Sequence, residues 1–136
     1  MSVALLVACS GASPTTVRRE LGVGDIAGEY QLTHIGNEPL PAMADPGRVT
    51  VFSGHLALLD NLRFTQVTSE EVCIIGRCTS ASDTSQGTWE ILENGTLYFD
   101  DDRGYSCPPP RVVADGRSIR FYTATDTTLG FVYDRQ

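Results

Sequence analysis

The stretch that decides the fold class is Thr-Trp-Glu-Ile-Leu-Glu-Asn-Gly-Thr-Leu-Tyr-Phe-Asp, residues 88–100. Apolar and polar side chains alternate within it, so that Trp89 and Ile91 share one face of a strand and the polar residues take the other. Asn94 and Gly95 lie at its centre, and Asn-Gly is the strongest short-range signal for a β-hairpin. It suits a type I′ turn, in which both central residues have positive φ. We therefore expect a hairpin with one buried face and one wet face.

Turn residues and alternating strand segments also occur on both sides of this hairpin. Asp115 and Gly116 separate two further β-type segments and predict a second hairpin. Eight or nine short strands with turns every 8 to 12 residues indicate an all-β sandwich or up-and-down barrel, and the tight hairpins favour an antiparallel meander that closes into a small barrel of about eight strands. The other expected strands are residues 29–35, 48–52, 55–59, 62–68, 72–75, 111–114, 118–123 and 129–134, with long loops at 36–47, 79–87 and 101–110.

Length and charge exclude several classes of protein. The chain has 136 residues, 41% of them hydrophobic and 20% charged, which is enough for one ordinary domain and too apolar for wholesale disorder. Its formal net charge is -7, and all ten basic residues are Arg. Nucleic acid is disfavoured as a partner, because a phosphate backbone requires a basic surface.

The first nine residues resemble a bacterial lipoprotein signal peptide. A short apolar run ends in Leu6, Val7, Ala8 and Cys9, and a Ser/Gly/Ala/Pro/Thr stretch follows it. The resemblance implies a signal peptide over residues 1–8, a lipid on the Cys9 thiol and a flexible tether over residues 9–24. The apolar run is short and no basic residue precedes it, so we expect that the natural start lies further upstream. The alternative is a buried N-terminal element with an incidental cysteine.

This resemblance also implies a location. The protein would be anchored to a membrane of the bacterial cell envelope rather than span it, because no stretch approaches the about 20 apolar residues of a transmembrane helix. Ser10 after the lipidated cysteine is compatible with the outer membrane, facing the periplasm, if the host has two membranes.

The domain expected over residues 25–136 is similar to bacterial lipocalin-like lipoproteins, and four segments carry the likeness. They are Gly28-Glu-Tyr-Gln-Leu32 running into Gly36-Asn-Glu-Pro-Leu-Pro41, Val51-Phe-Ser-Gly-His-Leu-Ala-Leu58, Gly87-Thr-Trp-Glu90 and Phe131-Val-Tyr-Asp-Arg135. The resemblance implies a small lipocalin-like β-barrel and says little about activity.

The remaining cysteines predict one disulfide. If Cys9 is lipidated, an odd number is left in an oxidising compartment. Cys73 and Cys78 flank a turn, and a two-residue loop at Ile75-Gly76 would place them opposite each other as a close cross-strand pair. Ile is a poor residue for a primed turn, however, so a longer loop, or a bond from either cysteine to Cys107, stays open. A metal site is not expected, because this spacing lacks a zinc pattern.

No arrangement of residues predicts an enzyme or a cofactor. His34 and His55 look like ordinary strand residues, and no nucleophile motif accompanies them. The acidic run 100–102 lacks the pattern of a calcium loop and is expected to be a solvated turn. Glu90 and Glu93 lie on opposite faces of one strand and cannot act as a paired acid and base.

Two functions therefore remain. The first is non-enzymatic binding of a small apolar ligand inside the barrel, which the family resemblance places slightly ahead. The alternative is a protein-interaction or inhibitor lipoprotein that acts through its loops on a filled barrel. The side chains expected to line a ligand cavity, or else to fill the interior, are Tyr30, Phe52, Phe64, Trp89, Phe121 and Tyr133.

Overall fold

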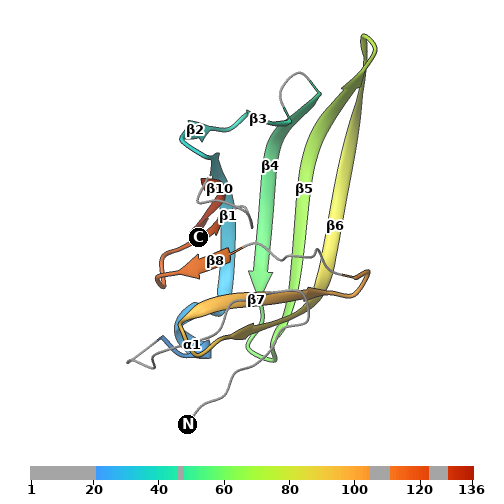
Figure 1. The fold of residues 1–136 in the computed structure, drawn as a ribbon. Coiled ribbons are helices and arrows are strands. Elements are labelled where there is room, and N and C mark those ends of the chain that lie inside the picture. The colour runs from blue at the N-terminus through green and yellow to red at the C-terminus, as the bar shows by residue number, and fades with distance from the viewer. Residues whose placement is uncertain (1–20, 46–47, 105–110, 123–128) are drawn as a thin grey trace.

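The computed structural model describes residues 21–45, 48–104, 111–122 and 129–136, so Cys9 and Cys107 lie outside the described residues. Among the residues that it describes, no helix is long and apolar enough to cross a membrane. The elements are α1 (Val23–Ile26), β1 (Gly28–Ile35), β2 (Glu38–Pro39), β3 (Ala42–Asp45), β4 (Val49–Leu58), β5 (Arg63–Ile74), β6 (Arg77–Ile91), β7 (Thr96–Asp101), β8 (Arg111–Ala114), β9 (Ser118–Tyr122) and β10 (Leu129–Arg135) (Figure 1).

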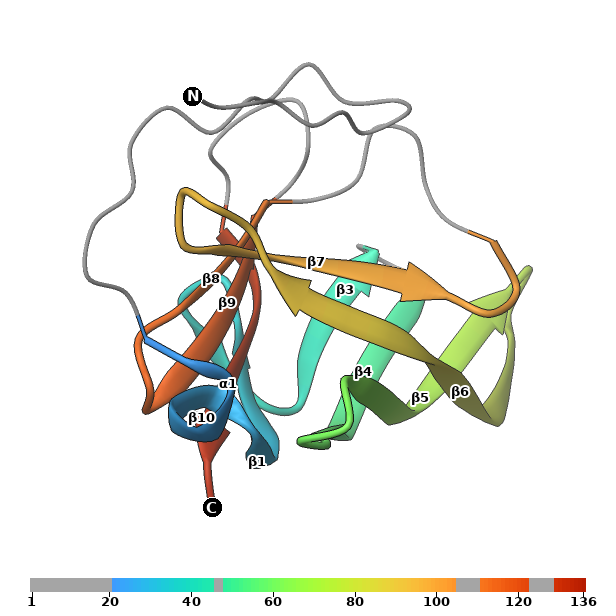
Figure 2. The ribbon, with the colours of Figure 1, turned by 90° about the horizontal axis from the view of Figure 1, so that it is seen from below.

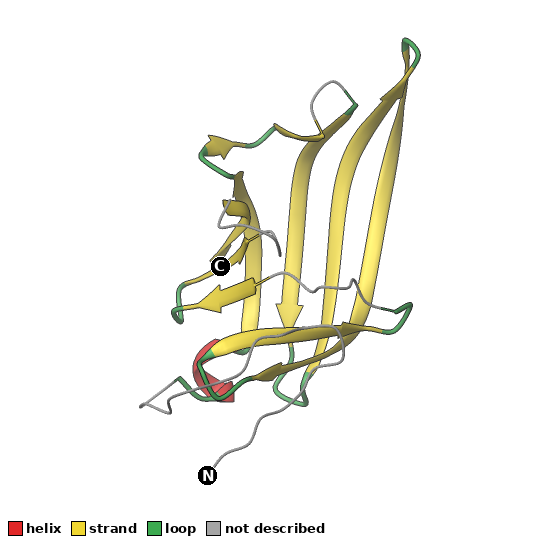
Figure 3. Cartoon of the chain, in the orientation of Figure 1, coloured by secondary structure: helices red, strands yellow, loops and turns green. Residues whose placement is uncertain are grey.

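The strands form one antiparallel sheet that closes on itself (Figure 3). From β4 to β10 each strand pairs with the next along the chain, β10 pairs with β1, and β1 pairs with β4 to complete the barrel. The short strands β2 and β3 are added at the rim, against β1 and β4. The predicted all-β, up-and-down barrel of about eight strands is thus confirmed.

Several strands are longer than the sequence predicted. β4 covers two of the predicted strands, which are joined across a bulge between Val51 and Ser53, and β5 likewise covers the two predicted over 62–75. The predicted loop at 79–87 is wrong, because β6 runs through it and begins at Arg77. Its Ser- and Thr-rich composition is typical of a loop, but it contains no Pro and pairs with β5 along its whole length.

The two predicted hairpins are present, but not with type I′ turns. β6 and β7 pair around Asn94-Gly95, and β8 and β9 pair around Asp115-Gly116. In each turn the glycine has positive φ, 89° at Gly95 and 90° at Gly116, whereas the residue before it does not. The Asn94 and Asp115 side chains instead accept backbone N–H bonds from residues two positions later.

The core fills the barrel towards the end at which α1 lies, which Figure 2 views directly. The largest side chains that are completely buried there are Trp89, Tyr30 and Tyr133. The folded part begins before residue 25, where the domain was expected to start, since Leu21 and Val23 pack against this core and Ile26 is buried in it.

Arg135 joins α1 to the barrel by hydrogen bonds. Its guanidinium donates to the carbonyl oxygens of Asp25, Ala27 and Gly116 and to the Tyr30 hydroxyl, at 2.7–3.1 Å. It also lies over the Tyr30 ring, 4.9 Å from the centroid, where a cation–π attraction adds to the hydrogen bonds.

Candidate functional site: the extended hairpin

The β5–β6 hairpin extends beyond the rest of the barrel (Figure 1). Its strands pair continuously from Arg63–Thr88 at the base to Ile74–Arg77 at the tip. β7 pairs with β6 only as far as Gly87, and the β6 side chains from Arg77 to Thr84 are all exposed. Among the described residues, the upper half of β6 therefore has no strand on its outer side, whereas β5 pairs with β4 as far as Val72.

A disulfide closes the tip. The Cys73 and Cys78 sulfur atoms are 2.03 Å apart and the two residues face each other across the strands, with their Cα atoms 4.0 Å apart. The pairing favoured from the sequence is confirmed, together with the two-residue loop at Ile75-Gly76. A bridge this close to the turn restrains the tip and lowers the conformational entropy that it would lose on binding.

The turn itself is built on an unfavourable residue. Ile75 has φ 50° and Gly76 has φ 75°, as a type I′ turn requires. Gly adopts this conformation freely, but a β-branched residue there is a steric outlier that costs about 1–3 kcal/mol. The side chain gains no compensating burial, because 96% of Ile75 is exposed.

Ile74 extends the apolar surface of the tip. It is 55% exposed, so two neighbouring isoleucines face solvent at the end of the hairpin. Arg77 pairs with Ile74 across the strands and is exposed as well, which places one cation beside them. Ile74, Ile75 and Arg77 together are called the tip surface below.

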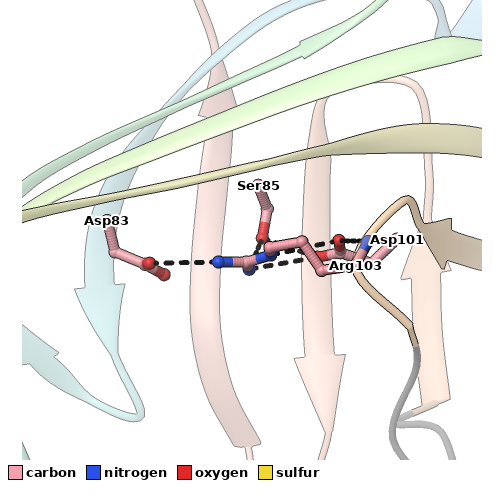
Figure 4. A network of polar contacts seen from close by, with 4 residues as sticks. All are labelled: Asp83, Ser85, Asp101 and Arg103. Atoms are coloured by element: carbon pink, nitrogen blue, oxygen red, sulfur yellow. Dashed lines mark hydrogen bonds and ion pairs between the residues drawn. The ribbon is translucent and has the colours of Figure 1, made fainter.

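A polar network braces the base of the hairpin against the turn after β7 (Figure 4). The Arg103 guanidinium donates to Ser85 Oγ at 2.6 Å and to the Asp101 carboxylate at 3.2 Å, and it lies 3.6 Å from Asp83. Ser85 Oγ in turn donates to Asp101 at 2.8 Å. The hydrogen bonds from the Arg103 side chain and backbone N–H lower the pKa of Asp101 to about 2.

This network sets the geometry of the hairpin more than its stability. The Arg103 and Asp83 side chains are well exposed, and exposed ion pairs contribute little because water screens them. Asp83 and Ser85 belong to β6, Asp101 ends β7 and Arg103 lies in the turn after it, so the network links β6 to the end of β7.

Five of the six predicted interior side chains belong to the core. Tyr30, Phe64, Trp89 and Tyr133 are buried in it and Phe121 packs against it. Phe52 does not line the interior, because it lies at the β4 bulge with 49% of its surface exposed.

Aromatic rings form a row across the interior. The centroid of Phe99 lies 4.9 Å from that of Phe64 and 5.6 Å from that of Phe121, whose ring is 5.8 Å from Tyr133. These distances are typical of direct aromatic packing. Phe64, Phe121 and Tyr133, which were expected to contact a ligand, therefore each contact another aromatic ring.

Polar groups among the buried rings are paired. The Tyr133 hydroxyl accepts a short hydrogen bond from Gln66, and burial raises the pKa of Tyr133 to about 12. Burial also raises the pKa of Tyr30, which the neighbouring Arg135 cation partly offsets. The Trp89 indole N–H donates to the carbonyl oxygen of Leu59 at 3.0 Å.

The histidines and acidic residues considered above do not converge. His55 pairs with Glu29 at 3.1 Å on the surface, and the His34 ring lies 3.0 Å from the hydroxyl of its neighbour Thr33. Asp102 pairs with Arg63 at 2.9 Å and Asp101 with Arg103, so both acidic side chains have arginine partners.

Glu71, Cys73 and Cys78 place three potential metal ligands within 4.8 Å of one another. Both sulfur atoms are joined in the disulfide, so they offer no thiolate to a metal ion.

The comparisons with known proteins give no family for this chain. No protein-family model matches it, and no curated protein matches it either. The resemblance to lipocalin-like lipoproteins stays a prediction.

The tip surface is the candidate site that sequence reasoning missed. The available signal was Ile-Ile-Gly enclosed between two cysteines, in which two isoleucines occupy a turn too short to bury them. The sequence does not show how long β5 and β6 are. The isoleucine at position 75 therefore indicated only that a primed turn is unfavourable there.

Proposed function

We propose that this chain is a lipid-anchored β-barrel of the bacterial cell envelope that binds a partner protein through its tip surface. The observation that carries the proposal is Ile75, an exposed β-branched residue held at positive φ. Strained backbone tends to be retained where it serves function, and exposed apolar side chains on a restrained support are typical of binding sites.

The chemistry of the tip favours an apolar recess on the partner. Full burial of one isoleucine side chain stabilises a complex by about 1.5–3 kcal/mol, so Ile74 and Ile75 can anchor a moderate interaction. Arg77 adds a cation at the rim of the contact, where it would favour acidic groups on the partner.

A protein suits this surface better than the membrane that holds the anchor. The hairpin tip and α1 lie at opposite ends of the molecule (Figure 1), and the predicted lipid on Cys9 precedes α1 in the chain. The net charge of -7 also opposes approach to an anionic lipid surface. Glu70 and Glu71, in β5 below the tip, add negative charge that also opposes an anionic lipid surface.

The small-ligand hypothesis has less support. Five of the six residues expected to line a cavity belong to the core or pack against it, and Phe52 is 49% exposed. Native mass spectrometry of the full chain before and after denaturation tests it. Extra mass that is lost on denaturation would favour a carrier, and a bare chain mass would favour a filled barrel.

Site-specific photocrosslinking tests the protein-binding proposal. A benzophenone amino acid at Ile74 is expected to give a discrete protein adduct in envelopes. The same group at Leu62 is the matched control, because Leu62 is a partly exposed apolar residue in a turn at the opposite end of β5. Equal adducts at both positions, adducts with lipid alone, or none at Ile74 would contradict the proposal.

A further inference from the structure

Among the residues that the structure describes, no strand pairs with the outer edge of β6 along the extended hairpin. The Gln86 carbonyl oxygen accepts a bond from Asp102 N–H at 2.8 Å, and above it β7 contributes no further pair among the described residues. Main-chain groups alternate in direction along a strand, so those of Ser82, Ser80 and Cys78 point the same way as those of Gln86. These groups face away from β5 and can accept another strand.

In the described part of the chain, this edge lacks the features that usually protect one. Natural edge strands carry Lys or Pro, contain bulges, or are covered by another segment. Residues 79–85 read Thr-Ser-Ala-Ser-Asp-Thr-Ser, and their pairing with β5 is free of register shifts. The single charge, on Asp83, already lies 3.6 Å from Arg103. The edge is therefore a template for strand addition.

Two boundaries restrict the register of an added strand. On one side, β6 is limited by the turn at Ile75-Gly76. On the other side, the Gln86 carbonyl oxygen already accepts a hydrogen bond from Asp102 N–H. A second copy, related by a two-fold axis perpendicular to the sheet, runs antiparallel and fits between them when Ser80 lies opposite Ser80 of the other copy.

In this register, opposite charges of the two copies face each other and their main-chain hydrogen-bonding groups align. It places Arg77 opposite Asp83 of the other copy, and both side chains project from the same face, since they pair with Ile74 and Thr68 of β5. The outward main-chain groups of Ser80 meet their equivalents, while those of Cys78 meet those of Ser82.

We propose that two copies of this chain pair through their β6 edges and join their β4–β5–β6 strands into one continuous sheet. A second copy fits better than an unrelated peptide. Strand addition obtains its specificity from pockets for alternate side chains, and a row of small hydroxyl-bearing residues matches an identical row instead. The inference does not rest on the proposed function: the dimer uses one residue of the tip surface, Arg77, and does not pair Ile74, which lies on β5.

Sedimentation equilibrium tests the dimer. The sample is the full chain with Cys9→Ser, which removes the predicted lipid. A short edge-to-edge contact is a weak interface, so we expect a reversible dimer with a dissociation constant on the order of 100 µM. Ser82→Pro removes an outward N–H that β5 does not use and is expected to weaken the dimer at least about tenfold. Ser82→Ala keeps the N–H and is the matched control.

Either of two results would overturn the proposal. One is a monomer throughout, up to about 500 µM, and the other is a dimer that Ser82→Pro leaves intact. Far-ultraviolet circular dichroism of both variants shows whether the barrel is folded, so that a loss of dimer can be assigned to the edge.

Cysteine cross-linking tests the register in the same chain with Cys107→Ser added. Ser80→Cys places two thiols opposite each other, with Cα atoms about 5.5 Å apart, which a disulfide can bridge. Thr84→Cys, on the same exposed face, leaves them more than about 25 Å apart and faces Gly76 of the other copy rather than a cysteine. We expect a covalent dimer from Ser80→Cys alone, with Cys73–Cys78 intact in peptide mapping. Equal cross-linking of both variants, or of neither, would contradict this register.

Discussion

Two non-glycine residues of the described chain have positive φ, Leu62 at 70° and Ile75 at 50°. They differ in what surrounds them. The Leu62 N–H donates to the Leu59 carbonyl and its own carbonyl accepts from Trp89 N–H, at 3.0 and 2.9 Å, so its conformation is part of the bonding that closes the barrel end. Ile75 lies at a tip that projects into solvent. No burial of its side chain offsets the strain at Ile75, and this is the observation on which the proposed function rests.

Gly87 is required by a close approach of two backbones. A Cβ atom at this position would lie 2.0 Å from the Asp100 carbonyl oxygen, where neither strand can move freely. We expect Gly87→Ala to lower the free energy of unfolding by about 3 kcal/mol in urea denaturation. Gly24→Ala is the control, since nothing lies within 4 Å of its Cβ position, and it should be neutral or slightly stabilising. Equal effects would refute the steric account.

The buried Tyr133 predicts a loss of stability in alkali. Its pKa is about 12 in the folded chain and about 10 when unfolded, so above pH 10 the folded state binds more protons and stability falls as pH rises. The loss should reach about 2 kcal/mol between pH 9 and pH 11.5, with no contribution from this group below pH 9. Urea denaturation across this range should show a shallower decline for Tyr133→Phe. An unchanged slope would mean that Tyr133 titrates normally.

At the scale of elements, the sequence predicts the positions of the turns more accurately than their backbone conformations. Asn94-Gly95 and Asp115-Gly116 are in turns as predicted, yet only their glycines have positive φ. The residue pair with two positive φ values is Ile75-Gly76, which local preferences disfavour. Its geometry follows from the register of two long strands and from the disulfide, and neither is encoded in the turn residues alone.

The hairpin tip should open independently of the barrel. Because the β6 side of the tip is exposed and has no outer partner strand among the described residues, selective reduction of the Cys73–Cys78 bond should change the global free energy of unfolding by less than about 1 kcal/mol. Amide hydrogen exchange should accelerate at least about tenfold near the tip and stay unchanged in β1 and β10. A global loss near the about 2 kcal/mol that loop-closure entropy gives for this ring would show that tip and barrel unfold together.

At the scale of the whole molecule, alternation and turn spacing were sufficient for the barrel class, because each strand must bury one face. The length of the hairpin could not be predicted, because its Ser- and Thr-rich half becomes a strand only through pairing with β5. The tip surface follows from that length. The aromatic residues were identified from the same alternation, with Phe52 misplaced because the bulge shifts its side chain outwards.

The anchor belongs to the same scale and is tested by Cys9→Ala. If Cys9 carries the lipid, this variant should move from the membrane fraction to the soluble envelope fraction, because no other attachment is proposed. Fractionation followed by immunoblotting measures the change, and Ser10→Ala should remain membrane-bound. Unchanged membrane association of Cys9→Ala would refute lipidation at that position.

Ile75→Asn is the most direct test of the claim that the strained tip binds a protein. Asn-Gly suits the turn, so the variant should be as stable as the natural chain or more stable by up to about 1 kcal/mol. The measurement is the yield of the protein adduct from the benzophenone at Ile74, with and without this substitution. We predict at least a tenfold loss of adduct from a barrel that is equally or more stable, and an undiminished adduct would contradict the account.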